Sequence, residues 1–218
     1  MAAILLAGGL GACGTLSRQR AEEQQYVDEP VARIYNRGAD NLDRRRWAQA
    51  IQAFEEVERQ HPYSSWARRA MLMQAYAHYQ ANQYDEAIEN AQRFLSLHPG
   101  NESAPYAYYL VAMCHFERIL DVGRDQATTE RALTALNDVV RRYPESTFAR
   151  DARLKIDMVY DQLAGKEMEV GRFYLDRDQH LAAINRFRNV IENENYQRTT
   201  HVPEALHRLV EAYVSIGM

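Results

Sequence analysis

The side chains that could perform catalysis or bind a metal ion form no recognised constellation in this sequence of 218 residues. Seven histidines occur, but no pair has the HExxH spacing of a zinc site, and the adjacent Cys114 and His115 point to different sides of a helix. Gly165-Lys166 lacks the upstream glycine and the Ser or Thr of a phosphate-binding loop. The sequence therefore predicts no catalytic residue, no metal site and no cofactor. We expect His115 to pack inside a helical array and Cys114 to be buried.

One cysteine is placed for covalent modification. Leu10-Gly11-Ala12-Cys13 resembles the bacterial lipobox, in which an aliphatic residue and two small residues precede the cysteine that receives a lipid. The thiol forms a thioether to diacylglycerol, and cleavage before the cysteine then frees its amine for a further acyl chain. Several chains anchor a protein stably, because each buried methylene contributes about 0.8 kcal/mol. We therefore predict lipid on Cys13; the alternative is an ordinary secretory signal with an incidental cysteine.

The segments beside this cysteine agree with a lipoprotein. Residues 1–12 are apolar and shorter than the ~20 residues that span a bilayer, which is typical of a signal peptide. They contain no Lys or Arg, so we expect the signal to be truncated at its start. Gly14 is not the Asp that retains enteric lipoproteins in the inner membrane, which favours the outer membrane. Residues 13–30 are predicted to be a flexible tether that packs on nothing.

Composition excludes several classes of protein. Twenty-six Lys and Arg against 30 Asp and Glu give a net charge of −4, without the basic excess of a nucleic-acid-binding surface. The hydrophobic fraction of 46% is too high for a disordered chain, and two cysteines exclude a disulfide-rich scaffold. Only 6 prolines and 10 glycines occur, and four of the glycines crowd the N-terminus. The remainder is therefore predicted to form long helices.

A pattern of small, aromatic and proline residues recurs along the chain. Each copy has a small residue, then an Ala, an aromatic or apolar residue, a further apolar residue, and a Pro that ends a helix. This is the tetratricopeptide (TPR) pattern, which predicts an all-α superhelix, an α-α solenoid of helical hairpins. The four full copies are Gly38, Ala50, Phe54, Val57, Pro62; Ala75, Ala87, Ala91, Phe94, Pro99; Ala112, Ala132, Leu136, Val139, Pro144; and Gly171, Ala183, Phe187, Val190 with Asn195 in place of Pro.

Two insertions interrupt the regular spacing of this repeat. Eight extra residues lie inside the third copy, and 14 precede the fourth, which predicts one long helix over Thr147–Asp176 with Gly165 as its weak point. Pro203–Ile216 begins like the first helix of a fifth repeat. The prediction is therefore four full repeats plus one further helix, whose apolar face is left exposed.

Tyrosines are numerous enough to suggest peptide recognition. First helices line the concave side of a TPR superhelix, and Tyr76, Tyr79, Tyr106, Tyr108 and Tyr109 lie on first helices. Tyrosine offers a large contact area at low entropic cost, although packing in the core is the safer reading for any one of them.

The connection after the first repeat adds two aromatic residues. Tyr63 and Trp66 lie there, at the mouth of the N-terminal repeats. We predict a substrate-peptide groove; the alternative for Trp66 is a purely structural contact between repeats. The groove residues are predicted to be Tyr63, Trp66, Tyr76 and Tyr79.

With the lipobox and the repeats in place, the chain resembles the BamD (ComL) family of TPR lipoproteins of the outer-membrane β-barrel assembly (BAM) complex. The eight-residue insertion and the elongated fourth-repeat helix match that family and not TPR proteins in general. The resemblance covers about residues 33–218 and is most telling in Asp121–Gln126 (DVGRDQ), Ala132–Pro144, Ala149–Tyr174, Ala182–Val190 (AAINRFRNV) and Thr199–Tyr213.

The resemblance implies a non-catalytic scaffold at the outer membrane, lipid-anchored on its periplasmic face. Repeats 1–3, residues 31–145, would receive unfolded outer-membrane β-barrel proteins. Residues 146–218, repeat 4 and half of repeat 5, would bind a POTRA domain of the barrel-forming subunit BamA, with Arg186 pairing to an acidic group there. Other BAM lipoproteins are implied as partners, and nucleic acid is not. The alternatives are a generic periplasmic TPR lipoprotein that organises envelope enzymes or export, and a soluble periplasmic chaperone.

Overall fold

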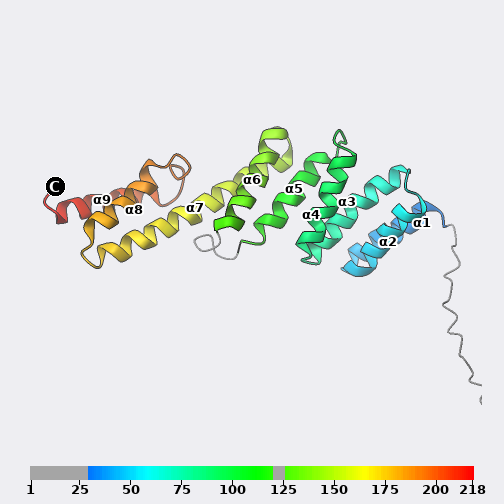
Figure 1. Ribbon diagram of the computed structural model, residues 1–218, viewed down its shortest axis with the longest axis horizontal. Helices are drawn as coiled ribbons and strands as arrows, with labels where there is room; N and C mark the ends of the chain where they lie inside the picture. The colour runs from blue at the N-terminus through cyan, green and yellow to red at the C-terminus, as the bar shows by residue number, and fades with distance from the viewer. Residues whose placement is uncertain (1–28, 120–125) are drawn as a thin grey trace, which may run out of the picture.

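A computed structural model describes residues 29–119 and 126–218, and in these residues it contains nine α-helices and no strand (Figure 1). The predicted lipidation site Cys13, the signal peptide and most of the tether lie outside the described residues. The all-α prediction is confirmed. The helices are α1 (Val31–Asp43), α2 (Trp47–Gln60), α3 (Ser65–Gln80), α4 (Tyr84–Leu97), α5 (Ala104–Phe116), α6 (Gln126–Arg142), α7 (Thr147–Leu175), α8 (His180–Glu192) and α9 (Val202–Ser215).

The helices form a row of four hairpins followed by α9 (Figure 1). Each odd-numbered helix packs against the even-numbered helix that follows it, and each even-numbered helix packs against the first helix of the next repeat. The first helices of neighbouring repeats also contact one another, α1 with α3, α3 with α5 and α5 with α7. This is the arrangement of a TPR superhelix, whose inner side is formed by the first helices.

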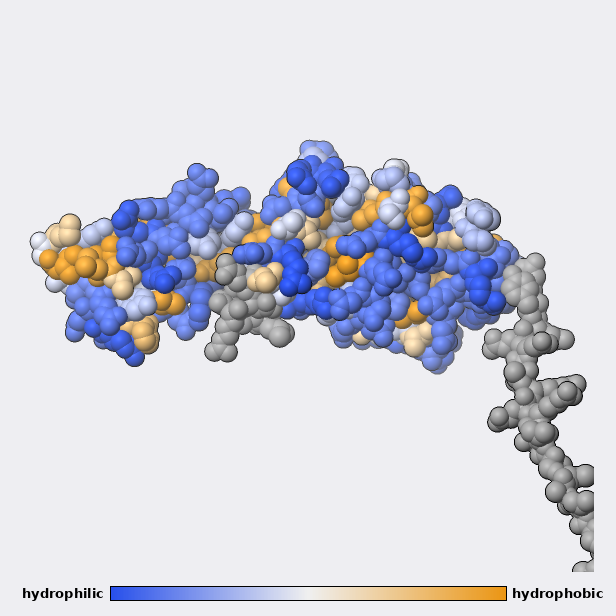
Figure 2. Space-filling view, in the orientation of Figure 1, coloured by the Kyte–Doolittle hydropathy of each residue, from blue (hydrophilic) through white to orange (hydrophobic). Residues whose placement is uncertain are grey.

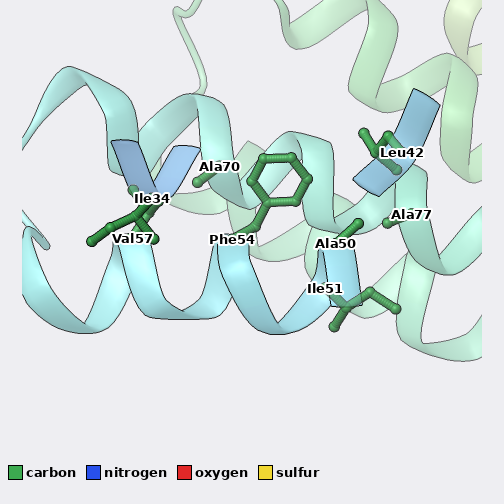
Figure 3. Packing of buried hydrophobic residues seen from close by; sticks show 8 residues of the cluster. All are labelled: Ile34, Leu42, Ala50, Ile51, Phe54, Val57, Ala70 and Ala77. Atoms are coloured by element: carbon green, nitrogen blue, oxygen red, sulfur yellow. The ribbon is translucent and has the colours of Figure 1, made fainter. Parts of the chain in front are cut away.

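The first and fourth hairpins close where a glycine of the first helix meets an aromatic ring of the second. Gly38 of α1 lies against the buried ring of Phe54, the largest side chain of the core cluster in Figure 3. A Cβ at Gly38 would lie 2.7 Å from the Cε1 of Phe54, and one at Gly171 would lie 2.4 Å from the Cε1 of Phe187. Real Cβ atoms do not approach carbon so closely, so the aromatic rings occupy the space that the glycines leave.

Two first helices begin with the same serine N-cap. Ser64 and Ser146 each follow a helix-ending proline by two residues, and each side-chain Oγ accepts a hydrogen bond of 3.0 Å from the backbone N–H three residues on. Such an N-cap contributes about 1 kcal/mol. Proline stops one helix and serine starts the next, which keeps these connections short.

Helix α7 is unbroken over its 29 residues, as the spacing predicted. Gly165 does not interrupt it. Instead, the missing side chain makes room for His201, because a Cβ there would lie 2.8 Å from the His201 Nε2. The extra length of α7 therefore gives the connection between α8 and α9 a surface to pack on.

The last helix exposes the apolar face that the sequence predicted. Ala205 and Ala212 of α9 are buried against the preceding repeat, while Leu206, Val210 and Val214 are 50%, 62% and 67% exposed. Hydrophobic surface gathers at this end of the molecule (Figure 2).

The expectation that the tether packs on nothing is wrong at its last residues. The backbone N–H of Glu29 donates to the Gln60 Oε1 at 3.1 Å, and its carbonyl oxygen lies 2.9 Å from a ring nitrogen of His61. Its carboxylate pairs with Arg37 at 2.9 Å. No periodic pattern indicates these contacts, because each joins a single pair of residues, 8, 31 or 32 positions apart.

The glycine–aromatic contact predicts that one added methyl group destabilises the protein. We expect Gly171→Ala to lower the free energy of unfolding by about 1–2 kcal/mol, because overpacking costs about 1–3 kcal/mol and the better helix propensity of Ala returns part of it. Urea denaturation followed by circular dichroism measures the change. Gly100→Ala is the control, since a Cβ at Gly100 meets nothing within 4 Å. Equal stabilities of the two variants would contradict the packing argument.

Candidate functional site

The inner side of repeats 2–4 carries an aromatic strip, which we define as Tyr76, Tyr79, Tyr106, Tyr109 and Phe148. These residues come from α3, α5 and α7, the three consecutive first helices that contact one another. The rings of Tyr106 and Tyr109 lie 5.4 and 5.3 Å from that of Phe148, in tilted arrangements. Two of the predicted groove residues, Tyr76 and Tyr79, belong to this strip; Phe148 was missed by sequence reasoning.

Two phenols of the strip, those of Tyr79 and Tyr109, are kept protonated by burial and a nearby carboxylate. The Tyr109 hydroxyl donates a hydrogen bond to Asp151, and the Tyr79 hydroxyl donates to Glu117 at 3.4 Å. Burial and the Glu117 charge raise the pKa of Tyr79 to about 12, and burial and Asp151 raise the pKa of Tyr109. A half-buried, uncharged aromatic surface with polar tips can contact both the side chains and the backbone of an extended peptide.

Tyr108 lies outside the strip; the sequence left open which tyrosines of the first helices pack in the core. Its ring lies 5.7 Å from that of Tyr143, and the Arg142 guanidinium lies 5.0 Å above it. It lines a hollow between α4 and α6 on the second-helix side. Tyr108 and Tyr109 are adjacent, so they lie about 100° apart around α5 and cannot both face inward.

The two aromatics after the first repeat are separated by the structure. Tyr63 is 97% exposed, whereas Trp66 packs into the core cluster of repeat 1 with its ring centroid 4.9 Å from that of Tyr35. The geometry gives Trp66 a structural contact between repeats 1 and 2. It does not bring Tyr63 and Trp66 together as one aromatic surface.

Arg186 already has a partner within the chain. Its side chain is 44% exposed, and its Nη1 lies 3.2 Å from the Glu167 Oε2 on α7. The adjacent Phe187 is fully buried, so Arg186 does lie outside that core, as expected from the helical periodicity. The ion pair joins residues that are 19 positions apart, which no local pattern indicates.

The connection after α8 is fixed on α7 by a carboxylate that sequence reasoning did not single out. Asp161 accepts hydrogen bonds from the backbone N–H and the hydroxyl of Thr200, at 2.8 and 2.9 Å. His201 lies 3.7 Å from the same carboxylate. Together with Gly165, Asp161 therefore sets where α9 begins.

The isolated reactive residues do not assemble into a catalytic or metal site in the part of the chain that the structure describes. Cys114 is buried, as expected, and burial raises the pKa of its thiol to about 12. Burial lowers the pKa of His115. Within residues 29–119 and 126–218, no group of three His, Cys, Asp or Glu side chains could hold a metal ion. None of the described helices is long and apolar enough to cross a bilayer.

Fold and surface together define the class: a tetratricopeptide-repeat protein with an aromatic inner face. A family model described as an outer membrane lipoprotein, YfiO, matches residues 27–218. Two curated relatives are each called outer membrane protein assembly factor BamD. That of Caulobacter vibrioides is 58% identical over all of this chain and 70% of its own length; that of Rickettsia prowazekii is 41% identical over all of this chain and 84% of its own.

The chain therefore belongs to the YfiO family of outer membrane lipoproteins, which includes the BamD proteins. Among solved structures, a TPR protein of Thermus thermophilus is 15% identical and covers 87% of this chain and 100% of its own, with a TM-score of 0.45.

The packing of Trp66 predicts which aromatic matters for stability. We expect Trp66→Ala to lower the free energy of unfolding by about 2 kcal/mol, less than the 3–5 kcal/mol of a fully buried ring because Trp66 is only partly covered. Tyr63→Ala is the matched control and should stay within about 0.5 kcal/mol of the parent. Both are measured by urea denaturation. An unchanged stability of Trp66→Ala, with weaker peptide binding, would instead assign Trp66 to the groove.

Proposed function

We propose that this protein is a non-catalytic, lipid-anchored scaffold of outer-membrane protein assembly. The observation that carries the proposal is the similarity along the whole chain to proteins named as outer membrane protein assembly factors. The lipobox at Leu10–Cys13 supports an anchor in the outer membrane with the repeats on the periplasmic face. The lipid on Cys13 is the only covalent group that the proposal requires.

The inner face of the superhelix supports a role in holding unfolded β-barrel chains. The strands of such chains alternate apolar and polar side chains. The aromatic strip offers rings for the apolar side chains, and Tyr79 and Tyr109 hold polar tips at its surface. We assign the strip, and not Tyr63 or Trp66, as the main substrate surface, because its five rings come from three consecutive first helices that contact one another.

The other end of the array is proposed to bind BamA. Repeat 4 and α9 present exposed apolar side chains beside charged ones, the mixture expected of a protein interface. Arg186 lies in this region. Its planar guanidinium can hold a carboxylate through two hydrogen bonds, which suits an acidic group on a POTRA domain. Pairing with Glu167 orients the arginine before the partner arrives.

Lipid anchoring is tested at Cys13. We expect Cys13→Ala in the full-length precursor to move the protein from the outer-membrane fraction to the soluble periplasmic fraction, because the acyl chains provide the anchor. Cell fractionation with a high-salt wash and immunoblotting measures the distribution. Cys114→Ala is the matched control, since that thiol is buried and should leave the protein in the membrane. A Cys13→Ala protein that resists the salt wash would rule out the lipid as the anchor.

The assembly role and Arg186 are tested together by co-purification of BamA from detergent-solubilised envelopes. We expect the parent to recover BamA and Arg186→Glu to bind it at least about thirtyfold more weakly, since reversing an interfacial charge costs about 2 kcal/mol or more. Failure of the parent to recover BamA, or recovery of peptidoglycan enzymes in its place, would favour a generic TPR lipoprotein.

A charge swap separates the two roles of Arg186. Arg186→Glu combined with Glu167→Arg restores the ion pair between α7 and α8 but leaves the POTRA domain facing a reversed charge. We expect the swap to recover the thermal stability of the parent and not its affinity for BamA. Recovery of both would mean that Arg186 acts only within the chain. Arg188→Glu, which changes an exposed arginine paired along its own helix, is the control for net charge.

A further inference from the structure

Three consecutive arginines form the turn between α1 and α2. Arg44, Arg45 and Arg46 are all exposed. None of them makes an ion pair, a side-chain hydrogen bond or a ring contact with any residue that the structure describes. Other arginines of the first two repeats, Arg37 and Arg93, pair with carboxylates at 2.9 Å. The turn therefore carries positive charges that the fold does not use.

The backbone of this turn does not favour arginine. Arg45 has a φ of 56°, in the left-handed region that Asn and Asp tolerate better than other side chains. The α3–α4 and α7–α8 turns have the same backbone hydrogen bonds, and they place Asn82 and Asp178 at this position. Arg46 is the N-cap of α2, whose first turn holds no acidic residue, so the helix dipole also opposes the positive charges. A residue kept in spite of such a local cost indicates a role outside the fold.

The charge of the hairpin turns changes along the array. Figure 1 shows the α1–α2, α3–α4 and α7–α8 turns along the lower edge. Residues 40–49 have a net charge of +1 with histidine neutral, because Asp40 and Asp43 offset two of the three arginines. The equivalent residues 77–86 and 173–182 have net charges of −2 and −1. Among these three turns, the edge is therefore positive only at repeat 1.

The positive turn belongs to the repeat that the predicted lipid tether joins. Gln60 and His61 hold the backbone of Glu29 at the start of the fold. The 16 residues from Cys13 to Glu29 span at most about 55 Å when fully extended, and α1 leads about 20 Å further to the turn. An anchored protein therefore keeps the turn within reach of the membrane surface. A contact that is weak between separate molecules becomes effective at such a high local concentration.

The surroundings of the turn favour lipid headgroups over a folded partner. The planar guanidinium binds phosphate oxygens through paired hydrogen bonds, and basic residues near a membrane are attracted to its anionic lipids. A protein interface has an apolar centre beside its charges. Here the exposed neighbours are the small Ala48 and the polar Gln49, and Trp47 packs against the core of repeat 1. The turn is a charged corner without an apolar contact surface.

We propose that Arg44, Arg45 and Arg46 bind anionic phospholipid headgroups of the membrane that holds the lipid anchor. This inference rests on the proposed function, because it assumes the anchor at Cys13. The contact orients the array: the hairpin turn of repeat 1 lies at the membrane, and the acidic turns of repeats 2 and 4 are repelled from it. The later repeats then project away from the bilayer.

The test uses the full-length lipidated protein, reconstituted in vesicles and labelled with a fluorophore on one added cysteine. Gln49→Cys places the label just after the turn, and Ser215→Cys places it at the end of α9; both positions are exposed. Because Cys114 is buried and Cys13 carries the lipid, only the added cysteine reacts. The vesicles contain phosphatidylethanolamine with either phosphatidylglycerol or phosphatidylcholine. A lipid with a spin-labelled headgroup quenches any fluorophore held at the surface.

We expect the label at position 49 to be quenched at least about twofold more than the label at position 215 in vesicles with phosphatidylglycerol. Most of this excess should disappear with phosphatidylcholine, which removes the negative charge, and at high salt, which screens it. Comparing the two lipids separates a charge contact from the mere nearness of repeat 1 to its anchor.

The combined variant Arg44→Gln, Arg45→Asn and Arg46→Gln should remove the excess. Asparagine suits the left-handed position, as in repeat 2, so this variant should be at least as stable as the parent in urea denaturation. The matched control changes three exposed arginines of the later repeats to Gln and should keep the excess. These three are Arg141, Arg150 and Arg153.

Equal quenching at the two positions would overturn the inference and leave the anchor standing. An excess of the same size in both kinds of vesicle would do so as well. An excess that persists in the arginine variant would place the contact elsewhere on repeat 1 and also overturn it. A parent protein that does not stay on the vesicles would overturn both the inference and the proposed anchor.

Discussion

The close approach of a glycine to an aromatic ring sets the distance between the helices of the first and fourth hairpins. At Gly38 and Gly171 no side chain beyond hydrogen fits beneath Phe54 and Phe187. Ala75 and Ala112 are fully buried at the equivalent positions. Because each hairpin cannot bury its other face alone, the hairpins must stack, and the stack curves. The aromatic strip on the inner side is therefore a consequence of packing on the opposite side of the first helices.

The curvature of the stack explains why aromatic residues of different repeats form one surface. First helices of successive repeats contact one another, so Tyr76, Tyr106 and Phe148 lie side by side although they are distant in the sequence. The phenols of Tyr79 and Tyr109 stay protonated because they are half-buried and donate hydrogen bonds to carboxylates. A rigid, neutral surface of this kind would need little ordering of its own to bind a peptide, since the rings are already held in place.

The elongated α7 adds polar contacts to the packing at the C-terminal end of the array. Its second half carries Glu167, which orients Arg186, and Asp161, which fixes the connection before α9. Gly165 between them makes room for His201. Repeat 4 is thus built around polar contacts to a long helix, in addition to the Phe187 core. This arrangement leaves the exposed side chains of α9 pointing away from the array.

Periodic features could be predicted from the sequence, because an α-helix turns every 3.6 residues and each repeat places the same kinds of residue at the same packing positions. The all-α class, the four hairpins, the long α7, the buried Cys114 and the exposed face of α9 were all expected on that basis.

Which tyrosines face inward was decided by tertiary structure: Tyr108 and Tyr109 are neighbours in sequence, and only the position of α6 and α7 separates their roles. The same holds for Trp66, whose contact with Tyr35 joins two repeats, and for Arg186, whose partner lies 19 residues away. Single long-range contacts leave no period in a sequence, so they appear only once the chain has folded.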